Sequence, residues 1–273
     1  MSAKSETFGQ AENAATKARI LITGASSGIG AVYADRFAKR GHGLVLAARD
    51  AARLEALAER LRREAGVSVE VLCADLTKVA DLQALEARLR DDAAIETLIN
   101  NAGAANWGPF LGQSAEAAAD IIALNVTALT RLSAAAAPRL AAAGRGAIVN
   151  IGSVVGLAPE LGMTVYGATK AFVLFLSQGL QRELGPRGVY VQAVLPAATR
   201  TEIWGRGGAD INQIQGVMDV DELVVAALVG FDRREEITLP TLPDVAQWEA
   251  FQAARVAMLP NFRQPHPAAR YLT

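Results

Sequence analysis

Short runs of consecutive apolar residues alternate with longer alanine-rich segments along most of this 273-residue sequence. Runs that are apolar at successive positions are typical of strands buried on both faces. The alternation predicts a parallel sheet flanked by helices. The predicted strands cover residues 20–23, 43–48, 68–73, 97–100, 147–151 and 189–194, with a seventh at 236–239. The predicted helices cover residues 29–40, 51–65, 78–90, 114–143, 165–184 and 221–231.

Right-handed crossovers between parallel strands lead to a doubly wound sheet, so we predict a single α/β domain over residues 19–273. Residues 1–18 are polar and mixed in charge, and we predict a flexible N-terminal arm there. The segment 197–219 is rich in glycine and polar residues, which predicts a substrate lid. In the C-terminal tail, 240–273, a short helix at 244–258 is expected to pack on the core or on another subunit.

Composition argues against several classes of function. The net charge of −1 gives no electrostatic attraction to nucleic acid or to an anionic membrane. No uninterrupted apolar run approaches the ~20 residues that cross a bilayer. The two histidines, His42 and His266, have no metal-ligand spacing, so no metal is expected. The single cysteine, Cys73, suits a reducing, cytoplasmic compartment, and its apolar neighbours predict a buried side chain.

A glycine-rich loop follows the first predicted strand and precedes the first helix. Its glycines allow a sharp turn and a close approach to a pyrophosphate, whose charge the helix N-terminus favours. This order of strand, loop and helix predicts a dinucleotide site rather than an ordinary turn. The residues expected to bind from this loop are Gly24, Ser26, Ser27, Gly28, Ile29 and Gly30.

Further motifs follow in a fixed order behind this loop. They are Asp75 after the third strand, Asn100-Asn101-Ala102-Gly103 at the end of the fourth, Asn125 in the next helix, Ser153 after the fifth strand, and Tyr166-Gly167-Ala168-Thr169-Lys170. With the Thr-Gly-x-x-x-Gly-x-Gly spacing of the loop, they resemble the short-chain dehydrogenase/reductase family from about residue 19 to residue 201. The resemblance implies a Rossmann-type doubly wound sheet of about seven parallel strands.

By this resemblance, Asn125, Ser153, Tyr166 and Lys170 are the catalytic residues. Tyr166 and Lys170 share a helix face, and an ammonium ~4 Å from a phenol is expected to lower its pKa from ~10. Lys170 would also hold the nicotinamide ribose, and Asn125 would anchor a helix kink and a water that leads protons to Lys170. Ser153 would donate to the substrate oxygen. Hydride would pass from the nicotinamide to a carbonyl carbon while Tyr166 protonates the oxygen.

The resemblance also implies which residues contact the cofactor beyond the glycine loop. They are Arg49, Asp75, Leu76, Asn101, Ala102, Gly103, Tyr166, Lys170, Pro196, Thr199 and Thr201. Where NAD-preferring relatives end the second strand with an acidic residue, this sequence has Ala48 followed by Arg49, whose guanidinium can bind a 2′-phosphate. NADP(H) is therefore expected, with Asp50 as the alternative ribose ligand if the strand ends later. Ala197 replaces a family glycine and is expected to restrict φ beside the nicotinamide.

The substrate is expected to meet apolar side chains around these motifs. The residues are Val154, Val155, Leu161, Met163, Ile203 and Trp204, with Ala104 and Trp107 as further candidates. They favour a hydrophobic ketone or aldehyde, or in reverse a secondary alcohol. The alternatives are a 3-oxoacyl-carrier-protein reductase, with Arg182 and Arg187 as its candidate basic patch, and a non-catalytic NADPH-sensing regulator. The resemblance implies a homo-oligomer, a dimer or tetramer assembled through the helices 114–143 and 165–184.

Overall fold

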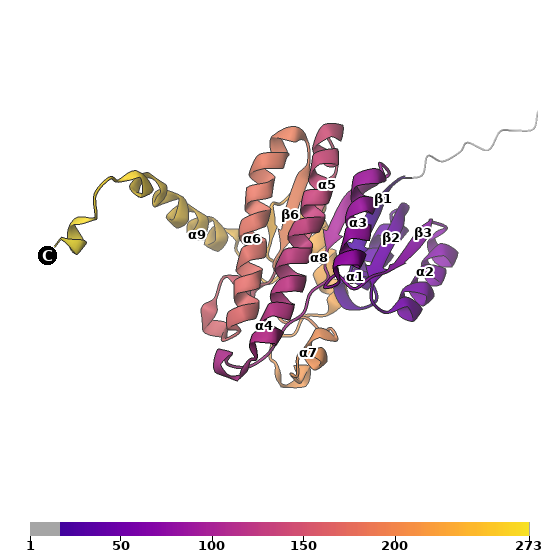
Figure 1. The fold of residues 1–273 in the computed structure, drawn as a ribbon, viewed down its shortest axis with the longest axis horizontal. Helices are drawn as coiled ribbons and strands as arrows, with labels where there is room; N and C mark the ends of the chain where they lie inside the picture. The colour runs from indigo at the N-terminus through magenta and orange to yellow at the C-terminus, as the bar shows by residue number, and fades with distance from the viewer. Residues whose placement is uncertain (1–16, 273) are drawn as a thin grey trace, which may run out of the picture.

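The computed structural model describes residues 17–272 and confirms the predicted architecture. Seven parallel strands form one sheet in the order β3-β2-β1-β4-β5-β6-β7, with helices on both faces (Figure 1). The strands are β1 Lys17–Thr23, β2 His42–Ala48, β3 Val69–Cys73, β4 Ile95–Asn100, β5 Ala147–Ile151, β6 Tyr190–Val194 and β7 Ile237–Thr238. The helices are α1 Gly28–Lys39, α2 Ala51–Ala65, α3 Val79–Asp91, α4 Ala115–Ile122, α5 Leu129–Ala143, α6 Thr164–Leu184, α7 Ile203–Arg206, α8 Val220–Asp232 and α9 Val245–Ala257.

Alternate side chains of β1, an interior strand of the sheet, pack in two separate hydrophobic layers. Ile20 and Ile22 of β1 pack with α1, α2 and α8 on one face of the sheet. Leu21 packs with α3 and α5 on the other face. Because both faces are covered, the strands carry apolar residues at successive positions, which is the pattern that predicted them.

The predicted N-terminal arm at 1–18 lies outside the described residues except for its last two positions. These two residues, Lys17 and Ala18, belong to β1, which begins earlier than predicted. Cys73 is exposed, which makes the prediction of a buried thiol wrong. It ends β3, the edge strand of the sheet, where a further strand does not cover it, and its Sγ donates to the Arg49 carbonyl oxygen at 3.4 Å.

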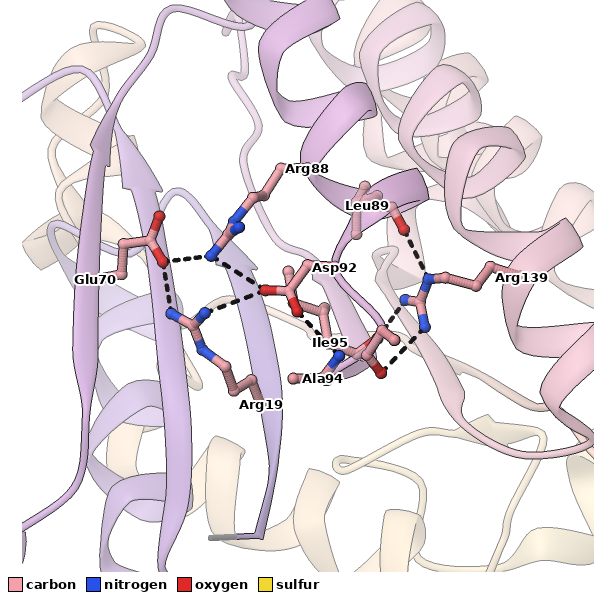
Figure 2. A network of polar contacts seen from close by, with 9 residues as sticks. Arg19, Glu70, Arg88, Leu89, Asp92, Ala94, Ile95 and Arg139 are labelled. Atoms are coloured by element: carbon pink, nitrogen blue, oxygen red, sulfur yellow. Dashed lines mark hydrogen bonds and ion pairs between the residues drawn. The ribbon is translucent and has the colours of Figure 1, made fainter.

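At the amino ends of the strands, a network of ion pairs joins β1, β3 and α3 (Figure 2). Arg19 bridges two carboxylates, with 2.6 Å from Nη2 to Glu70 Oε2 and 3.1 Å from Nη1 to Asp92 Oδ2. Arg88 contacts the same two carboxylate oxygens at 2.6 and 3.1 Å. In a parallel sheet this end is opposite the carboxyl edge, where α/β folds bind ligands, so the network serves the fold.

Buried amides link the middle of the sheet to the two long helices. Asn100 Nδ2 on β4 donates to Ser133 Oγ of α5 at 3.0 Å and to Asn150 Oδ1 of β5 at 2.9 Å. Asn150 Nδ2 in turn donates to Ser177 Oγ of α6 at 3.0 Å. These contacts fix the β4–β5 register and both helix positions, since polar groups at this depth need partners.

We expect Asn150→Leu to lower the free energy of unfolding by about 3 kcal/mol. The substitution removes the two buried hydrogen bonds of Asn150, to Asn100 and to Ser177, at up to about 1.5 kcal/mol each. Denaturant titration of the purified protein measures the loss, with the exposed Asn261→Leu as control. Equal stability of the two variants would contradict a structural role for the amides.

The helical run Ala115–Ala143 is long and apolar enough to span a bilayer by length and composition, with a mean hydropathy of 1.3. Half of its most apolar window is buried inside the protein, and core helices of soluble proteins also meet this criterion.

Candidate active site

The glycine loop between β1 and α1 lies against the turn that follows β4. Asn101 Nδ2 donates to the carbonyl oxygens of Thr23 and Gly24 at 2.9 and 3.1 Å. A Cβ at Gly30 would lie 2.5 Å from both Asn101 Nδ2 and the Gly24 carbonyl oxygen, so only glycine fits there. Gly24 and Gly28 have φ values of 64° and 54°, which favour glycine.

The start of α1 offers the anion site that the loop predicts. Ser27 occupies the N-cap position, and within the described chain its side chain makes no capping hydrogen bond. The first backbone N–H groups of a helix have no intrahelical partner, and the helix dipole favours negative charge beside them. The loop therefore fits the pyrophosphate of a dinucleotide.

The carboxyl end of β2 fits the adenosine 2′-phosphate of NADP(H). The strand ends at Ala48, and the Asp50 carboxylate accepts from the Arg53 N–H as the N-cap of α2. Asp50 therefore already has a structural role as a helix cap. This favours Ala48, rather than Asp50, as the residue that ends β2 beside the ribose. Arg49 is exposed and, among residues 17–272, has no carboxylate partner within 4 Å. Its guanidinium is available for a phosphate.

Asp75 lies beside Arg49 at the same edge of the sheet. Partial burial acts to raise the pKa of Asp75, but hydrogen bonds from Thr77 and the charge of Arg49 outweigh it, so the pKa lies below its usual value. The Asp75 carboxylate accepts from Thr77 Oγ1 and N at 2.7 and 3.0 Å. The side chain is thus ionised and held in place where the adenine is expected.

The predicted catalytic triad converges where β5 ends and α6 begins. Ser153 follows β5, and its hydroxyl lies near enough to the Tyr166 phenol to act on the pKa of that phenol. Lys170 is buried one helical turn after Tyr166, and its Nζ donates to the Ile151 carbonyl oxygen at 2.8 Å. An ammonium has three donors, so two remain for a ribose. The end of β5 and the start of α6 thus bring together a hydroxyl, a phenol and an amine.

The expected lowering of the Tyr166 pKa is wrong for this arrangement. Burial raises the pKa of Tyr166 to about 12, and the nearby Ser153 hydroxyl only partly opposes it. Burial also lowers the pKa of Lys170 to about 8. Lys170 Nζ lies 5.5 Å from the Tyr166 ring centroid and is held by the Ile151 carbonyl. Desolvation therefore outweighs the attraction that spacing alone suggested.

The lowered pKa of Lys170 predicts a stability that rises with pH. Between pH 8 and 10.5 the unfolded chain holds a proton at Lys170 that the folded chain has released, so alkali favours folding. We expect a gain of about 2 kcal/mol from pH 8 to 9.5, before the tyrosines titrate. Denaturant titrations across this range, compared with Lys170→Met, measure the gain. An identical slope in that variant would assign the pH dependence to other groups.

Asn125 lies in a π-helical segment, Ala123–Ala128, that joins α4 to α5. The run 114–143 is therefore continuous but irregular, as the resemblance implied. Asn125 Oδ1 accepts from Ala104 N, and its Nδ2 donates to Ala104 O, both at 2.9 Å. Nδ2 also contacts Thr169 Oγ1 at 3.1 Å. The amide thus positions the segment after β4 against the helix that carries Tyr166 and Lys170.

Two threonines within the quoted motifs escaped the sequence interpretation. Thr23 Oγ1 accepts from the N–H groups of Asn101 and Ala102, each at 3.0 Å, and so joins the glycine loop to the next motif. Thr169 bonds both Asn125 and the Tyr166 carbonyl oxygen. Each threonine is part of a motif, but its bonds to Asn101 and Ala102, or to Asn125, join distant parts of the chain that motif spacing does not reveal.

The predicted lid is a loop closed at its base. Thr199 and Met218 form a parallel bridge, and the loop carries α7 at Ile203–Arg206. Glu202 contacts Arg53 of α2, with 2.8 Å from each carboxylate oxygen to Nη1. Thr201 lies so near the glycine loop that a Cβ at Gly28 would be 3.2 Å from its Cγ2. The loop therefore passes beside the candidate cofactor site. Its role as a substrate lid stays a prediction.

Two tryptophans fix the other side of this loop. Trp204 is buried, stacks on Trp107 at 4.3 Å between ring centroids, and donates from Nε1 to the Thr199 carbonyl oxygen at 2.7 Å. A Cβ at Gly207 would lie 2.3 Å from Trp107 Nε1, which explains glycine at this position. Both predicted substrate residues thus hold the loop in place.

The other residues predicted to contact the substrate differ in how deeply they are buried. Val154 packs against the buried cluster of Leu174, Ala193 and Leu195, so it serves the core. Met163 is buried before α6, whereas Leu161 is 54% exposed. Val155 and Ile203 are half-buried. Their contact with a substrate stays a prediction.

Ala197, which replaces the family glycine, does not have a positive φ. Among the described non-glycine residues, a positive φ occurs only at Arg234. Pro196, beside Ala197, accepts from Val154 N and from Ser153 Oγ at 3.0 and 3.1 Å through its carbonyl oxygen. The segment after β6 therefore supports Ser153 directly. Thr199 bonds to the Ala197 carbonyl oxygen, and the cofactor contacts of Pro196, Thr199 and Thr201 stay predictions.

Comparison with known proteins agrees with this geometry. The family model described as short chain dehydrogenase matches residues 18–212. Sulfoacetaldehyde reductase of Chromohalobacter salexigens is 36% identical over 85% of this chain and 96% of that protein. Very-long-chain 3-oxoacyl-CoA reductase-A of Danio rerio is 31% identical over 67% of this chain, which spans only 58% of that longer protein.

Two solved structures are similar over almost the whole chain. A short-chain dehydrogenase from Sphingobium yanoikuyae in complex with NADPH has 65% identity and a TM-score of 0.92, over 93% of this chain and 99% of that one. The bulky-bulky ketone specific alcohol dehydrogenase from Comamonas testosteroni has 56% identity and a TM-score of 0.88, over 94% and 100%.

The fold and the site define an NAD(P)-dependent oxidoreductase that acts on CH–OH groups or the corresponding carbonyls. The chain belongs to the short chain dehydrogenase family. Its cofactor site fits NADP(H), through the glycine loop and the unpaired Arg49.

Proposed function

We propose that this protein reduces a hydrophobic ketone or aldehyde to an alcohol with NADPH, and catalyses the reverse oxidation. The observation that carries the proposal is the placement of Ser153, Tyr166 and buried Lys170 together, where β5 ends and α6 begins, at the sheet edge that also presents the glycine loop. The ketone specificity named for the Comamonas testosteroni neighbour supports the substrate class.

In this proposal the bound nicotinamide supplies the hydride. Ser153 holds the substrate oxygen, and Tyr166 donates its proton to that oxygen as negative charge develops there. A buried phenol with a raised pKa stays protonated at neutral pH, which suits a general acid in the reducing direction. Lys170 positions the cofactor ribose with its free donors and replaces the proton that Tyr166 loses, and Asn125 orders the water that leads to it.

Preference for NADPH over NADH follows from the end of β2. Ala48 places no carboxylate where it would repel a 2′-phosphate, and Asp50 is engaged as the α2 cap. Arg49 is exposed at this point and can form charge-assisted bonds to the phosphate. The NADPH bound to the Sphingobium yanoikuyae neighbour supports the same preference.

A 3-oxoacyl thioester is the second candidate substrate, supported by the Danio rerio relative. The basic patch that a carrier protein would need is not favoured at Arg182 and Arg187. Arg182 is 16 residues after Tyr166 on α6, about 24 Å along the helix, and it lies beside Glu235 and Glu236.

Cofactor consumption tests the proposal, followed by nicotinamide absorbance with NADPH and NADH in parallel. The panel contains aromatic ketones, aliphatic ketones, aldehydes, sulfoacetaldehyde and a 3-oxoacyl thioester. Turnover of a bulky apolar ketone with NADPH is the expected result. Turnover of the thioester alone, or of the charged aldehyde alone, would replace the substrate class. NADPH binding without turnover of any member would favour the sensing regulator.

We further propose a cytoplasmic homo-oligomer, a dimer or tetramer assembled through α4–α5 and α6. These helices lie side by side on one face (Figure 1), and α6 exposes Phe172 and Phe175. Exposed aromatic side chains on a helix favour burial in an interface. Light scattering at micromolar concentration is expected to give a multiple of the chain mass, and a monomer would contradict this assembly.

A further inference from the structure

A buried hydroxyl joins two parts of the candidate active site. Thr169 of α6 is 3% exposed, and Asn125 of the π-helical segment Ala123–Ala128 is 1% exposed. Asn125 Nδ2 donates to Thr169 Oγ1 at 3.1 Å, and Thr169 Oγ1 donates to the Tyr166 carbonyl oxygen at 2.7 Å. Because polar groups at this depth need partners inside the protein, these two hydrogen bonds hold the two segments together.

The chemistry of the groups fixes the direction of both hydrogen bonds. A carbonyl oxygen only accepts, so the single Thr169 proton goes to Tyr166, and the hydroxyl oxygen is left to accept from Asn125. The other Asn125 Nδ2 proton binds the Ala104 carbonyl oxygen at 2.9 Å, which leaves Oδ1 for the Ala104 N–H. The Thr169 hydroxyl thus helps to set which way the Asn125 amide faces.

The amide oxygen of Asn125 lies on the side of Lys170. A Cβ at Gly103 would be 3.3 Å from Asn125 Oδ1 and 3.7 Å from Lys170 Nζ, so both atoms border the space beside this glycine. A reversed amide would place N–H donors there instead of an acceptor. An ammonium has only donors, so the observed direction is the one that suits a neighbouring lysine.

At its other end, the Thr169 hydroxyl secures the turn of α6 that carries Tyr166. In a regular α-helix the Tyr166 carbonyl oxygen accepts from the N–H four residues later, which belongs to Lys170. One carbonyl oxygen therefore links the backbone of both proposed proton-transfer residues to Thr169. The N-cap residue of α6, Met163, makes no side-chain capping hydrogen bond within the described chain, so the first turn lacks that restraint.

We propose that Thr169 is a positioning residue for the proton transfer and acts through Asn125 and through the backbone of Tyr166. This role rests on the proposed function, in which Tyr166 donates the proton and Lys170 replaces it. Without the hydroxyl, one buried Asn125 proton has no partner and the first turn of α6 loses a restraint. The phenol and the amine then depart from the geometry that the reaction needs, while the glycine loop and Arg49 are untouched.

Thr169→Val removes the hydroxyl and keeps the shape of the side chain, and Thr169→Ser keeps the hydroxyl. The matched control is Ser177→Ala, because Ser177 repeats the arrangement about two turns further along α6. Ser177 Oγ accepts from Asn150 Nδ2 at 3.0 Å and donates to the Val173 carbonyl oxygen at 2.7 Å. Thr169→Val and Ser177→Ala each leave one buried asparagine proton unpaired, so a similar loss of stability is expected in both.

Steady-state kinetics with NADPH and an apolar ketone separate the two positions. Thr169→Val is expected to lower kcat roughly 10-fold, inside the ~10²-fold that a misplacement of about 1 Å can cost. Thr169→Ser is expected to restore kcat, and Ser177→Ala is expected to keep it. The KM for NADPH, and its dissociation constant from fluorescence titration, are expected to stay unchanged in all three variants.

Hydrogen exchange of the ligand-free full chain, followed by mass spectrometry, gives a second readout that needs no turnover. Thr169→Val is expected to speed the exchange of backbone amides in residues 123–128 and 164–170, because local opening of both segments becomes easier. Ser177→Ala is expected to leave the exchange of these two segments unchanged.

Three outcomes would overturn the positioning role. An equal fall of kcat in Thr169→Val and Ser177→Ala would assign the effect to the general stability of α6. Faster exchange in Thr169→Val with an unchanged kcat would make the contact structural only, and unchanged exchange would remove the coupling itself. An unmodified protein that turns over no member of the substrate panel would instead contradict the proposed function, and the exchange rates would still decide the coupling.

Discussion

Tyr166→Phe is expected to reduce kcat by about 10³-fold, within the 10²–10⁴-fold range of general acid–base catalysis. The substitution removes the hydroxyl that lies near Ser153 and is proposed to donate the proton, while the ring remains. NADPH binding is expected to stay within about twofold, because the glycine loop and Arg49 are untouched. Stopped-flow measurement of hydride transfer and fluorescence titration of NADPH separate the two effects.

Tyr271→Phe is the matched control for this result. This variant also loses a phenol hydroxyl, but Tyr271 is exposed in the C-terminal tail, away from the carboxyl edge of the sheet. Wild-type turnover in Tyr166→Phe would remove Tyr166 as the proton donor. Loss of NADPH binding together with turnover would assign Tyr166 to cofactor positioning instead.

Arg49→Ala is expected to lower kcat/KM with NADPH by roughly 10–100-fold, the equivalent of one charge-assisted contact of about 1.5–3 kcal/mol. Adding Ala48→Asp is expected to reverse the cofactor preference, because a carboxylate there repels the 2′-phosphate and accepts from ribose hydroxyls. The ratio of kcat/KM for NADPH and NADH measures both changes. The ratio should be more salt-dependent in the unmodified protein.

Arg63→Ala controls for the loss of one positive charge that lies away from the carboxyl end of β2. Arg63 lies in the last turn of α2, and its side chain is 72% exposed. An NADPH:NADH ratio that is equal in Arg49→Ala and Arg63→Ala would mean that Arg49 is an ordinary surface charge. Discrimination between NADPH and NADH would then depend on another group.

The local features of this protein could be predicted from its sequence. The strands end at Thr23, Ala48, Asn100 and Ile151 as expected, because apolar runs stop where the backbone leaves the core. The motif residues lie near those ends, and parallel strands place their carboxyl ends on one edge of the sheet. Ser153 and Tyr166 therefore had to meet near the glycine loop once the sheet was parallel. Sequence order was sufficient for this part of the site.

Features that depend on several segments together were decided only by the tertiary structure. The exposure of Cys73 follows from the position of β3 at the sheet edge, which its own residues do not specify. The raised pKa of Tyr166 reflects desolvation by all surrounding elements, whereas the spacing to Lys170 suggested the opposite sign. The contact between Arg53 and Glu202 joins positions 149 residues apart.

The C-terminal tail, residues 240–273, also has features that the sequence predicts and features that only the tertiary structure decides. Its helix was predicted from the sequence, because helical periodicity is local. Whether α9 packs on the core depends on the space that β6, β7 and α6 leave beside them. Trp248 of α9 packs in that space. Short-range pattern thus determined the elements and the order of the motifs. The exposure of a side chain, the shift of a pKa and the exposed surface of the C-terminal tail depend on contacts between distant segments. Only the folded chain decides them.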